Sequence, residues 1–402
     1  MMGNNGFVLF TFHFDNMDIK NLKQHIRTLI TLEKSNAPVI SCYINLSDKA
    51  VVKQFLANKG AELHNAISEQ ERKDLDAALK LIRSYDHPQT ERVKGIALFY
   101  RGGTKPFFKL LQFNVPLPNQ ISIGPAPYVY NLVELKDVYY RFIVLISTEE
   151  SARILEVNLG EVTKQVWMER PDLSPRSVQK WSKMHYQHHR KEIQEKFVDE
   201  KIRVLDKLIS RGDYAYLILA GESHMTSYIK NKLPEHLKEK LIDIVSTSGR
   251  DEISDIVAAT LSSFIQYEAQ ESMNTTELLI DEIKSNGMAV AGTAASLEAL
   301  KTGQVDLLVL AKDYQIDPAW SCPECHATGD KWPHKNICPV CGNNNLKEID
   351  LMEELVRIAE RHDCQIETVA HNDALKELGG AGCLLRYLTQ EQYEMNHFID
   401  VP

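Results

Sequence analysis

Short apolar runs typical of strands alternate with one long polar stretch in the first third of the chain. Residues 38–46, 93–100 and 107–115 are strand-like, and residues 50–84 have the pattern of a long polar helix. A proline-rich stretch at 116–127 then breaks the pattern. These elements predict an N-terminal α+β domain over residues 1–135.

Residues 136–271 begin with three consecutive strand-like runs. A polar loop follows them, and a long helix is predicted from about Pro175 to Ser210. Two further apolar strands each precede a helix, and the last helix is predicted to end near Glu271. Strands that alternate with helices are typical of parallel sheets, so we predict a middle domain with a mostly parallel α/β sheet. The predicted strands are 140–147, 152–159, 162–168, 214–220 and 241–245.

Residues 272–402 also alternate between helices and strands and predict a third, C-terminal α/β domain, beginning with a helix at 276–285. Residues 320–345 interrupt this alternation between a predicted strand and a predicted helix. The whole chain is therefore predicted to combine α/β and α+β architecture in three domains. The predicted strands of the third domain are 289–291, 305–311, 365–369 and 381–387, and its other helices are 294–302, 351–361 and 373–378.

The interrupting segment carries two CxxC pairs, Cys322-Pro-Glu-Cys325 and Cys338-Pro-Val-Cys341. Each pair places two thiolates on one tight turn, and two such turns supply the four soft ligands that a tetrahedral Zn²⁺ ion accepts. Four cysteines leave no open coordination position, so the sequence predicts one structural zinc ion in a zinc ribbon. The alternative, two disulfides, needs an oxidising compartment, which nothing in the sequence indicates.

Composition describes a soluble globular protein, with 44% hydrophobic and 25% charged residues among 402. The chain has no apolar run as long as a membrane span, and residues 1–14 lack the features of a signal peptide. The three remaining cysteines, Cys42, Cys364 and Cys383, lie in apolar stretches and are predicted to be core thiols. We therefore expect a cytoplasmic protein.

A local basic segment, residues 170–191, contrasts with the net charge of −9. It contains six Lys or Arg residues and a single acid, Asp172. Such a helix face can neutralise phosphates, and its aromatic residues can stack on unpaired bases, although most charge clusters are only solvated faces. Adjacent histidines on a helix diverge by about 100°, so they do not predict a metal site. The candidate RNA-binding residues are Arg170, Arg176, Gln179, Lys180, Trp181, Lys183, His185, His188, His189, Arg190 and Lys191.

Two stretches of the third segment resemble a known family. Residues 303–310 resemble a turn of the kink-turn-binding ribosomal-protein fold. Residues 378–387, Leu-Gly-Gly-Ala-Gly-Cys-Leu-Leu-Arg-Tyr, resemble the glycine-rich close of the archaeo-eukaryotic class-I release factor and Pelota superfamily. Some archaeal members carry Cys pairs at the same insertion point. The resemblance implies three domains, the last a kink-turn-binding-protein-like sandwich with an inserted zinc ribbon.

Both working motifs of a release factor are missing from this chain. Residues 168–181 contain no glycine, and Ser174-Pro175-Arg176 stands where the catalytic Gly-Gly-Gln would be expected. The Asn-Ile-Lys-Ser and Tyr-x-Cys-x-x-x-Phe motifs of stop-codon recognition are absent from residues 1–135, and residues 128–132 are the nearest remnant. Gln179 is the only candidate for a non-standard hydrolase. The sequence therefore predicts a protein that is not an enzyme.

The resemblance implies a factor that binds the ribosomal A site, with rRNA of the decoding centre and peptidyl transferase centre as partners. Bacterial relatives of the Balon type, which lack both motifs, are associated with ribosome hibernation. The family also implies contact with a translational GTPase such as elongation factor Tu, and we expect a monomer off the ribosome. Three alternatives stay open: Pelota-like rescue, peptidyl-tRNA hydrolysis by a non-standard loop, and RNA binding away from ribosomes.

Overall fold

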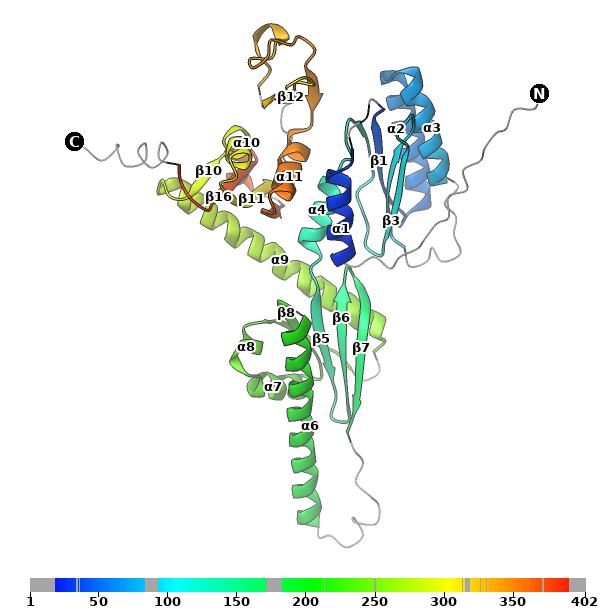
Figure 1. The fold of residues 1–402 in the computed structure, drawn as a ribbon. Helices are drawn as coiled ribbons and strands as arrows, with labels where there is room; N and C mark the ends of the chain where they lie inside the picture. Colours follow the sequence, from blue (N-terminus) through cyan, green and yellow to red (C-terminus); the bar gives the residue numbers. More distant parts are fainter. Residues whose placement is uncertain are drawn as a thin grey trace, which may run out of the picture.

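In the computed structural model the described residues form three sheets of four or five strands, each packed against helices, and a small three-stranded module that projects from the third (Figure 1). The described part of the chain consists of residues 19–33, 35, 37–83, 93–170, 183–212, 214–248, 251–312, 314, 319–325, 327–329, 331–370 and 372–389. The predicted mixed α/β, multi-domain architecture is confirmed at this level.

The first sheet is antiparallel and has the strand order β3-β2-β1-β4. Alternate positions of its central strand point to opposite faces. Ile40, Cys42 and Ile44 contact helices α2 and α3, whereas Tyr43 belongs to a second core with helices α1 and α4. The elements are α1 (Ile19–Ile30), β1 (Val39–Asn45), α2 (Lys49–Ala66), α3 (Glu69–Arg83), β2 (Gly95–Arg101), β3 (Phe107–Phe113), β4 (Gln120–Gly124) and α4 (Tyr130–Val138).

The single helix expected over residues 50–84 is wrong, because the chain forms two helices there. Ser68 starts the second one. Its backbone N–H donates to Glu71 Oε2 at 2.8 Å, and the Glu71 N–H donates back to Ser68 Oγ at 3.4 Å. This reciprocal pair satisfies N–H groups that a helix start leaves open, so it favours a new helix at this point. The sequence analysis also missed α1, β4 and α4.

The second sheet has the strand order β7-β6-β5-β8-β9 and is mixed, so the predicted mostly parallel sheet is only partly right. Strands β5, β8 and β9 are parallel, whereas β5, β6 and β7 pair antiparallel because turns of a few residues join them. Helices α6 and α7 cover one face and α9 covers the other. The elements are β5 (Phe142–Ser147), β6 (Ser151–Asn158), β7 (Glu161–Glu169), α6 (Lys183–Gly212), β8 (Tyr216–Gly221), α7 (Ser223–Lys232), α8 (Glu235–Lys238) and β9 (Leu241–Ser246).

Helix α9 (Ile253–Lys284) is continuous for 32 residues where the sequence predicted two helices with a boundary near residue 271. The segment between the two expected helices contains neither Gly nor Pro, so nothing in it stops a helix. Phe264 packs in the second sheet's core, and Leu279 packs in the third sheet's core. One helix therefore connects the two sheets (Figure 1).

The third sheet has the strand order β10-β16-β11-β15, in which only β11 and β15 are parallel. Gly379 and Gly380 turn from α12 into β16 with φ angles of +92° and +75°. A Cβ on Gly380 would collide with the Tyr314 ring, so these glycines serve a tight packed turn. The elements are β10 (Ala289–Ala291), α10 (Thr293–Lys301), β11 (Val305–Ala311), α11 (Leu351–Arg361), β15 (Gln365–Val369), α12 (Asp373–Glu377) and β16 (Ala381–Leu385).

The first and third segments pack against each other: α1 and α4 contact α11 and β15 through polar and apolar side chains. The buried Glu353 carboxylate of α11 accepts the Val129 and Tyr130 N–H groups at 2.9 and 2.8 Å, which caps the start of α4. Arg357 donates to the Pro127 carbonyl at 3.0 Å. The division into domains at residues 135 and 271 stays a prediction, and α4 and α9 each cross one of these boundaries.

The three cysteines outside the CxxC pairs, Cys42, Cys364 and Cys383, are buried thiols, which confirms them as core residues. Among the helices of the described residues, none is both long and apolar enough to cross a bilayer.

Candidate functional site

The first turns of helix α6, from Lys183 to Lys191, carry the last part of the basic segment, at the end of the second sheet that lies away from the other two (Figure 1). Residues 171–182, with Arg176, Gln179, Lys180 and Trp181, lie outside the described residues, and so does the expected helix start at Pro175. Lys191 is exposed on α6. For the remaining candidates on this helix the structure describes the backbone only; they are Lys183, His185, His188, His189 and Arg190.

Arg170 is the candidate whose side chain is anchored to the sheet. Its backbone N–H donates to the Glu150 carbonyl at 2.8 Å, and its guanidinium lies 3.8 Å from the Glu150 carboxylate. The Arg170 side chain is only 15% exposed. The anchored arginine ends β7 and fixes the point at which the basic segment leaves the sheet.

Lys201 of α6 is fully buried, and the sequence analysis missed it. Its Nζ donates to Ser147 Oγ at 2.9 Å and to the Thr148 carbonyl at 2.7 Å. Burial, with a smaller contribution from Arg170, lowers the pKa of this ammonium to about 8. The signal was available: Lys201 stands four residues after Phe197 and four before Leu205, on the buried stripe of the helix. The contact ties α6 to the end of β5.

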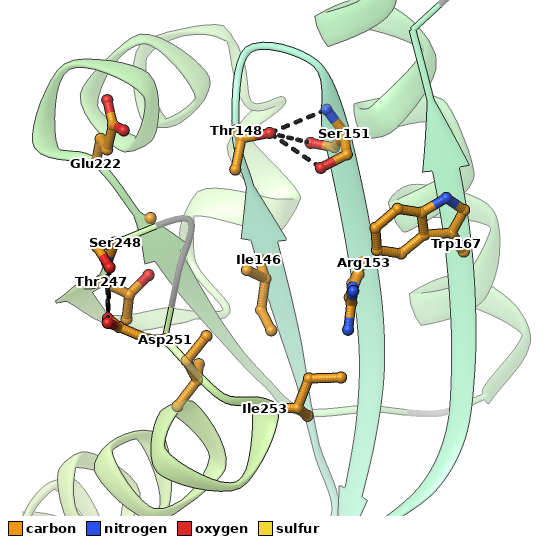
Figure 2. A pocket seen from close by; sticks show the side chains of 12 residues that line it. Ile146, Thr148, Ser151, Arg153, Trp167, Glu222, Thr247, Ser248, Asp251 and Ile253 are labelled. Carbon is orange, nitrogen blue, oxygen red and sulfur yellow. Dashed lines mark hydrogen bonds between the residues drawn. The ribbon is translucent and has the colours of Figure 1, made fainter.

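A pocket of about 110 Å³ opens where the parallel strands β5, β8 and β9 end (Figure 2). We call it the strand-end pocket. Open α/β sheets bind ligands at this edge because the loops that leave the strands diverge there. It is lined by Ile146, Thr148, Ser151, Arg153, Trp167, Gly221, Glu222, Thr247, Ser248, Asp251, Ile253 and Ile256.

Arg153 and Trp167 form one wall of the strand-end pocket. The guanidinium carbon of Arg153 lies 4.1 Å from the centroid of the Trp167 ring, which is a cation–π contact. Trp167 Nε1 donates to Glu169 Oε1 at 2.9 Å. Sequence reasoning assigned neither residue, although a tryptophan in a strand of mostly polar, exposed residues was a usable signal.

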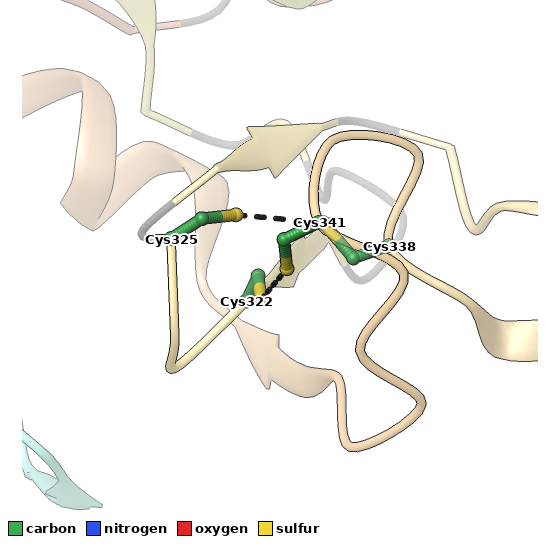
Figure 3. Close-up of side chains that lie close together, drawn as sticks. All are labelled: Cys322, Cys325, Cys338 and Cys341. Carbon is green, nitrogen blue, oxygen red and sulfur yellow. Dashed lines mark hydrogen bonds between the residues drawn. The ribbon is translucent and has the colours of Figure 1, made fainter.

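The four cysteines of the CxxC pairs come together in a module of three short strands, β12 (Ala319–Ser321), β13 (Thr328–Gly329) and β14 (Lys347–Ile349). We call residues 319–349 the cysteine module. It lies between β11 and α11, at the predicted insertion point. Figure 3 shows the thiols of Cys322, Cys325, Cys338 and Cys341 pointing toward one another, and all four Sγ atoms lie within 4.8 Å.

Backbone turns hold the thiols in place. The Cys322 N–H donates to the Ala327 carbonyl at 2.8 Å, and the Gly342 N–H donates to the Cys338 carbonyl at 2.9 Å. Gly342 has φ +78°, a conformation that favours glycine after the second Cys pair. The buried Trp320 packs against Cys322 and Cys338. Four thiolates at this separation can hold one metal ion, so the arrangement fits the donor set expected from the sequence.

The middle of the chain matches a family model, and about half of the chain is similar to curated proteins. Residues 127–264 match the model of "Bacterial archaeo-eukaryotic release factor family 10". Peptide chain release factor subunit 1 of Thermococcus sibiricus is 22% identical over 207 residues, 46% of this chain and 50% of that protein. The protein pelota homolog of Pyrococcus furiosus is 23% identical over 212 residues, 50% of this chain and 51% of that protein.

Similarity to solved structures is weaker. A model of ribosome-bound archaeal Pelota and ABCE1 contains a chain that is 14% identical, with a TM-score of 0.39 over 92% of this chain and 95% of that one. The chain spans about half the length of the curated relatives it matches. The family match and the curated relatives agree with the resemblance seen in the glycine-rich close and the order of elements. The family model over residues 127–264 and the curated relatives together support a bacterial-type member of the archaeo-eukaryotic release factor and Pelota superfamily.

Proposed function

We propose that this protein is a non-catalytic factor that binds the ribosomal A site in the cytoplasm and acts in ribosome hibernation. The observation that carries the proposal is the family match over residues 127–264, which includes the basic segment but no Gly-Gly-Gln. A basic helix end that lacks the hydrolytic tripeptide can contact rRNA phosphates without cleaving peptidyl-tRNA. The first domain then lies toward the decoding centre and the basic segment toward the peptidyl transferase centre.

Co-sedimentation with purified ribosomes at physiological salt tests the binding step. We expect the protein in the ribosomal pellet and a steep loss of binding as salt increases, because phosphate contacts release counterions. A protein that stays in the supernatant at physiological salt contradicts the proposal. A second measurement, release of labelled peptide from a ribosome complex, tests the absence of catalysis. Release above buffer that Gln179→Ala abolishes contradicts a non-catalytic role.

Pelota-like rescue is the second candidate, because a protein pelota homolog is among the relatives. The two functions differ in the ribosome they need. Hibernation requires binding to idle ribosomes without messenger, whereas rescue requires ribosomes stalled with peptidyl-tRNA and leads to subunit splitting. Parallel binding assays on the two complexes, followed by gradient analysis of subunits, decide between them. Addition of purified elongation factor Tu to both assays tests the proposed GTPase partner.

For the cysteine module we propose one structural Zn²⁺ held by Cys322, Cys325, Cys338 and Cys341. All-thiolate tetrahedral sites select zinc over hard cations. Such an ion, when bound, crosslinks two turns of a module whose hydrophobic cluster has three buried members among the described residues. We infer that its role is to stiffen a projection from the third sheet. The protein is proposed to be a monomer when it is off the ribosome.

A further inference from the structure

The face of the second sheet that α9 covers in part carries a row of three side chains that the proposed function does not use. Ile146 of β5 pairs with Arg153 of β6, and Arg153 pairs with Trp167 of β7. Cross-strand partners point to the same face of a sheet, so the three lie side by side. The first turn of α9 packs on Ile146 through Ile253 and leaves Trp167 45% exposed.

The Arg153–Trp167 pair is a stacking surface with spare hydrogen-bonding capacity. In the described part of the chain, no hydrogen bond or ion pair joins the Arg153 guanidinium to another residue; its contact is the indole face at 4.1 Å. A guanidinium has five N–H donors. A flat ligand can therefore stack on this wall and accept hydrogen bonds from Arg153 at the same time.

The opposite wall of the strand-end pocket supplies polar groups of both kinds. The Glu222 carboxylate, which also lies 3.5 Å from His224 Nδ1, is an acceptor, and the Thr247 hydroxyl is buried without a hydrogen-bond partner among the described residues. Asp251 is already engaged, because it accepts the Ser248 N–H and hydroxyl at 2.7 Å each. Figure 2 shows Glu222, Thr247 and Ser248 across the pocket from Arg153 and Trp167.

The charged residues that line the strand-end pocket disfavour ligands that carry a single charge. Arg153 would repel a cationic ligand, and Glu222 and Asp251 would repel a simple anion. A nucleotide unit has a flat base, donor and acceptor edges, sugar hydroxyls and a phosphate on one side only. We propose that the strand-end pocket binds one nucleotide unit, with its base stacked on Arg153 and Trp167 and its polar edges at Glu222 and Thr247.

The position of the pocket favours an unpaired nucleotide of RNA as the source. Trp167 precedes Arg170 by three residues of extended strand, which is about 10 Å, and the basic segment begins there. An RNA strand that contacts the start of the basic segment is therefore within reach of this wall, where aromatic and Arg planes are typical partners of splayed bases. This source rests on the proposed ribosome binding, whereas a free nucleotide would be bound independently of it.

Binding of a short single-stranded oligoribonucleotide and of free AMP to the full chain, measured by calorimetry, tests the proposal. We expect binding of at least one ligand that Trp167→Ala and Arg153→Ala each weaken about five- to a hundred-fold, because stacking on one base accounts for that range. Trp167→Phe should retain most of the affinity. Trp332→Ala is the matched control, since Trp332 is 40% exposed in the distant cysteine module.

The two sources separate in the same experiment. Affinity for the oligoribonucleotide alone assigns the pocket to RNA, and affinity for AMP assigns it to a free nucleotide. Binding of neither, or binding that Trp167→Ala and Arg153→Ala leave unchanged, overturns the proposal. Co-sedimentation of the same variants with ribosomes tests ribosome binding separately from nucleotide binding. A chain that pellets with ribosomes but binds no nucleotide refutes nucleotide binding in the pocket and leaves the proposed function unaffected.

Discussion

The Asp137 carboxylate at the end of α4 accepts two hydrogen bonds from Thr368 of β15, a residue 231 positions later in the chain. The Thr368 N–H donates at 2.7 Å and its hydroxyl at 2.5 Å. Both residues are buried. Burial first, and the neighbouring Glu367 second, raise the pKa of Asp137 to about 8, while the two Thr368 hydrogen bonds and, less strongly, Lys312 oppose this rise. A protonatable acid thus lies in the contact between the first and third segments.

We predict that the contact weakens as pH rises. The folded pKa of Asp137 is above its unfolded value, so the native state binds more protons and the free energy of unfolding falls between about pH 4 and pH 8. Glu268 and Glu353, whose pKa values burial raises to about 7 and about 8, act in the same direction. Asp137→Asn mimics the protonated acid and should reduce this fall, as measured by thermal midpoints from about pH 5 to pH 8. An identical slope in the variant would contradict the assignment.

Loss of the carboxylate that caps α4 should be costly. Glu353→Ala removes the acceptor of the Val129 and Tyr130 N–H groups and leaves the buried Arg357 without its carboxylate partner at 3.7 Å. Removing one partner of a buried pair costs about 3–5 kcal/mol. The neighbouring Glu354→Ala is the control, because Glu354 lies on the same helix but is partly exposed. Equal effects of the two variants in chemical denaturation would show that the cap is unimportant.

The cysteine module should lose its metal when one pair is removed. Cys322→Ser with Cys325→Ser leaves two thiolates, which are too few for a stable tetrahedral site. We expect about one equivalent of zinc in the purified wild type and almost none in the variant, measured by elemental analysis. Cys42→Ser, a buried thiol in the first sheet, should keep its zinc. Zinc content unchanged in the double variant would contradict the assigned ligands.

Charge reversal in the basic segment should weaken ribosome binding and its dependence on salt. Arg176→Glu, Lys180→Glu and Lys183→Glu together should make the plot of log affinity against log salt less steep, by about one for each phosphate that the variant no longer neutralises. Arg203→Glu, Lys207→Glu and Lys230→Glu change the net charge equally at exposed positions of the same region. A triple variant at the basic segment that binds like this control would exclude the segment from the interface.

The sequence predicted most strands and the cysteine module because those signals are local. Alternating apolar runs and CxxC spacing act over a few residues. Helix α4 was missed since its stability comes from elsewhere: six of its nine residues are buried, and its start is capped by Glu353, more than two hundred residues away. The amino-acid composition around α4 therefore does not predict a helix that depends on so distant a partner.

In the middle of the chain, too, the sequence predicted local features but not contacts between separate elements. The basic segment is contiguous in sequence and was predicted as one feature. The strand-end pocket instead joins residues of β5, β6, β7 and α9, and strand register alone brings Arg153 next to Trp167. Register depends on turns and on the helices that cover the sheet, so a single sequence does not specify it residue by residue.

Helix α9 also sets a distance. At 1.5 Å per residue its 32 residues extend for about 48 Å, from the strand-end pocket at Ile253 to the third sheet at Lys284. An unbroken helix of this length resists bending, because no Gly or Pro interrupts its hydrogen bonds between residues 271 and 276. Any large partner that contacts both ends must therefore match a nearly fixed spacing. The length of α9 therefore restricts such partners by their dimensions as well as by their chemistry.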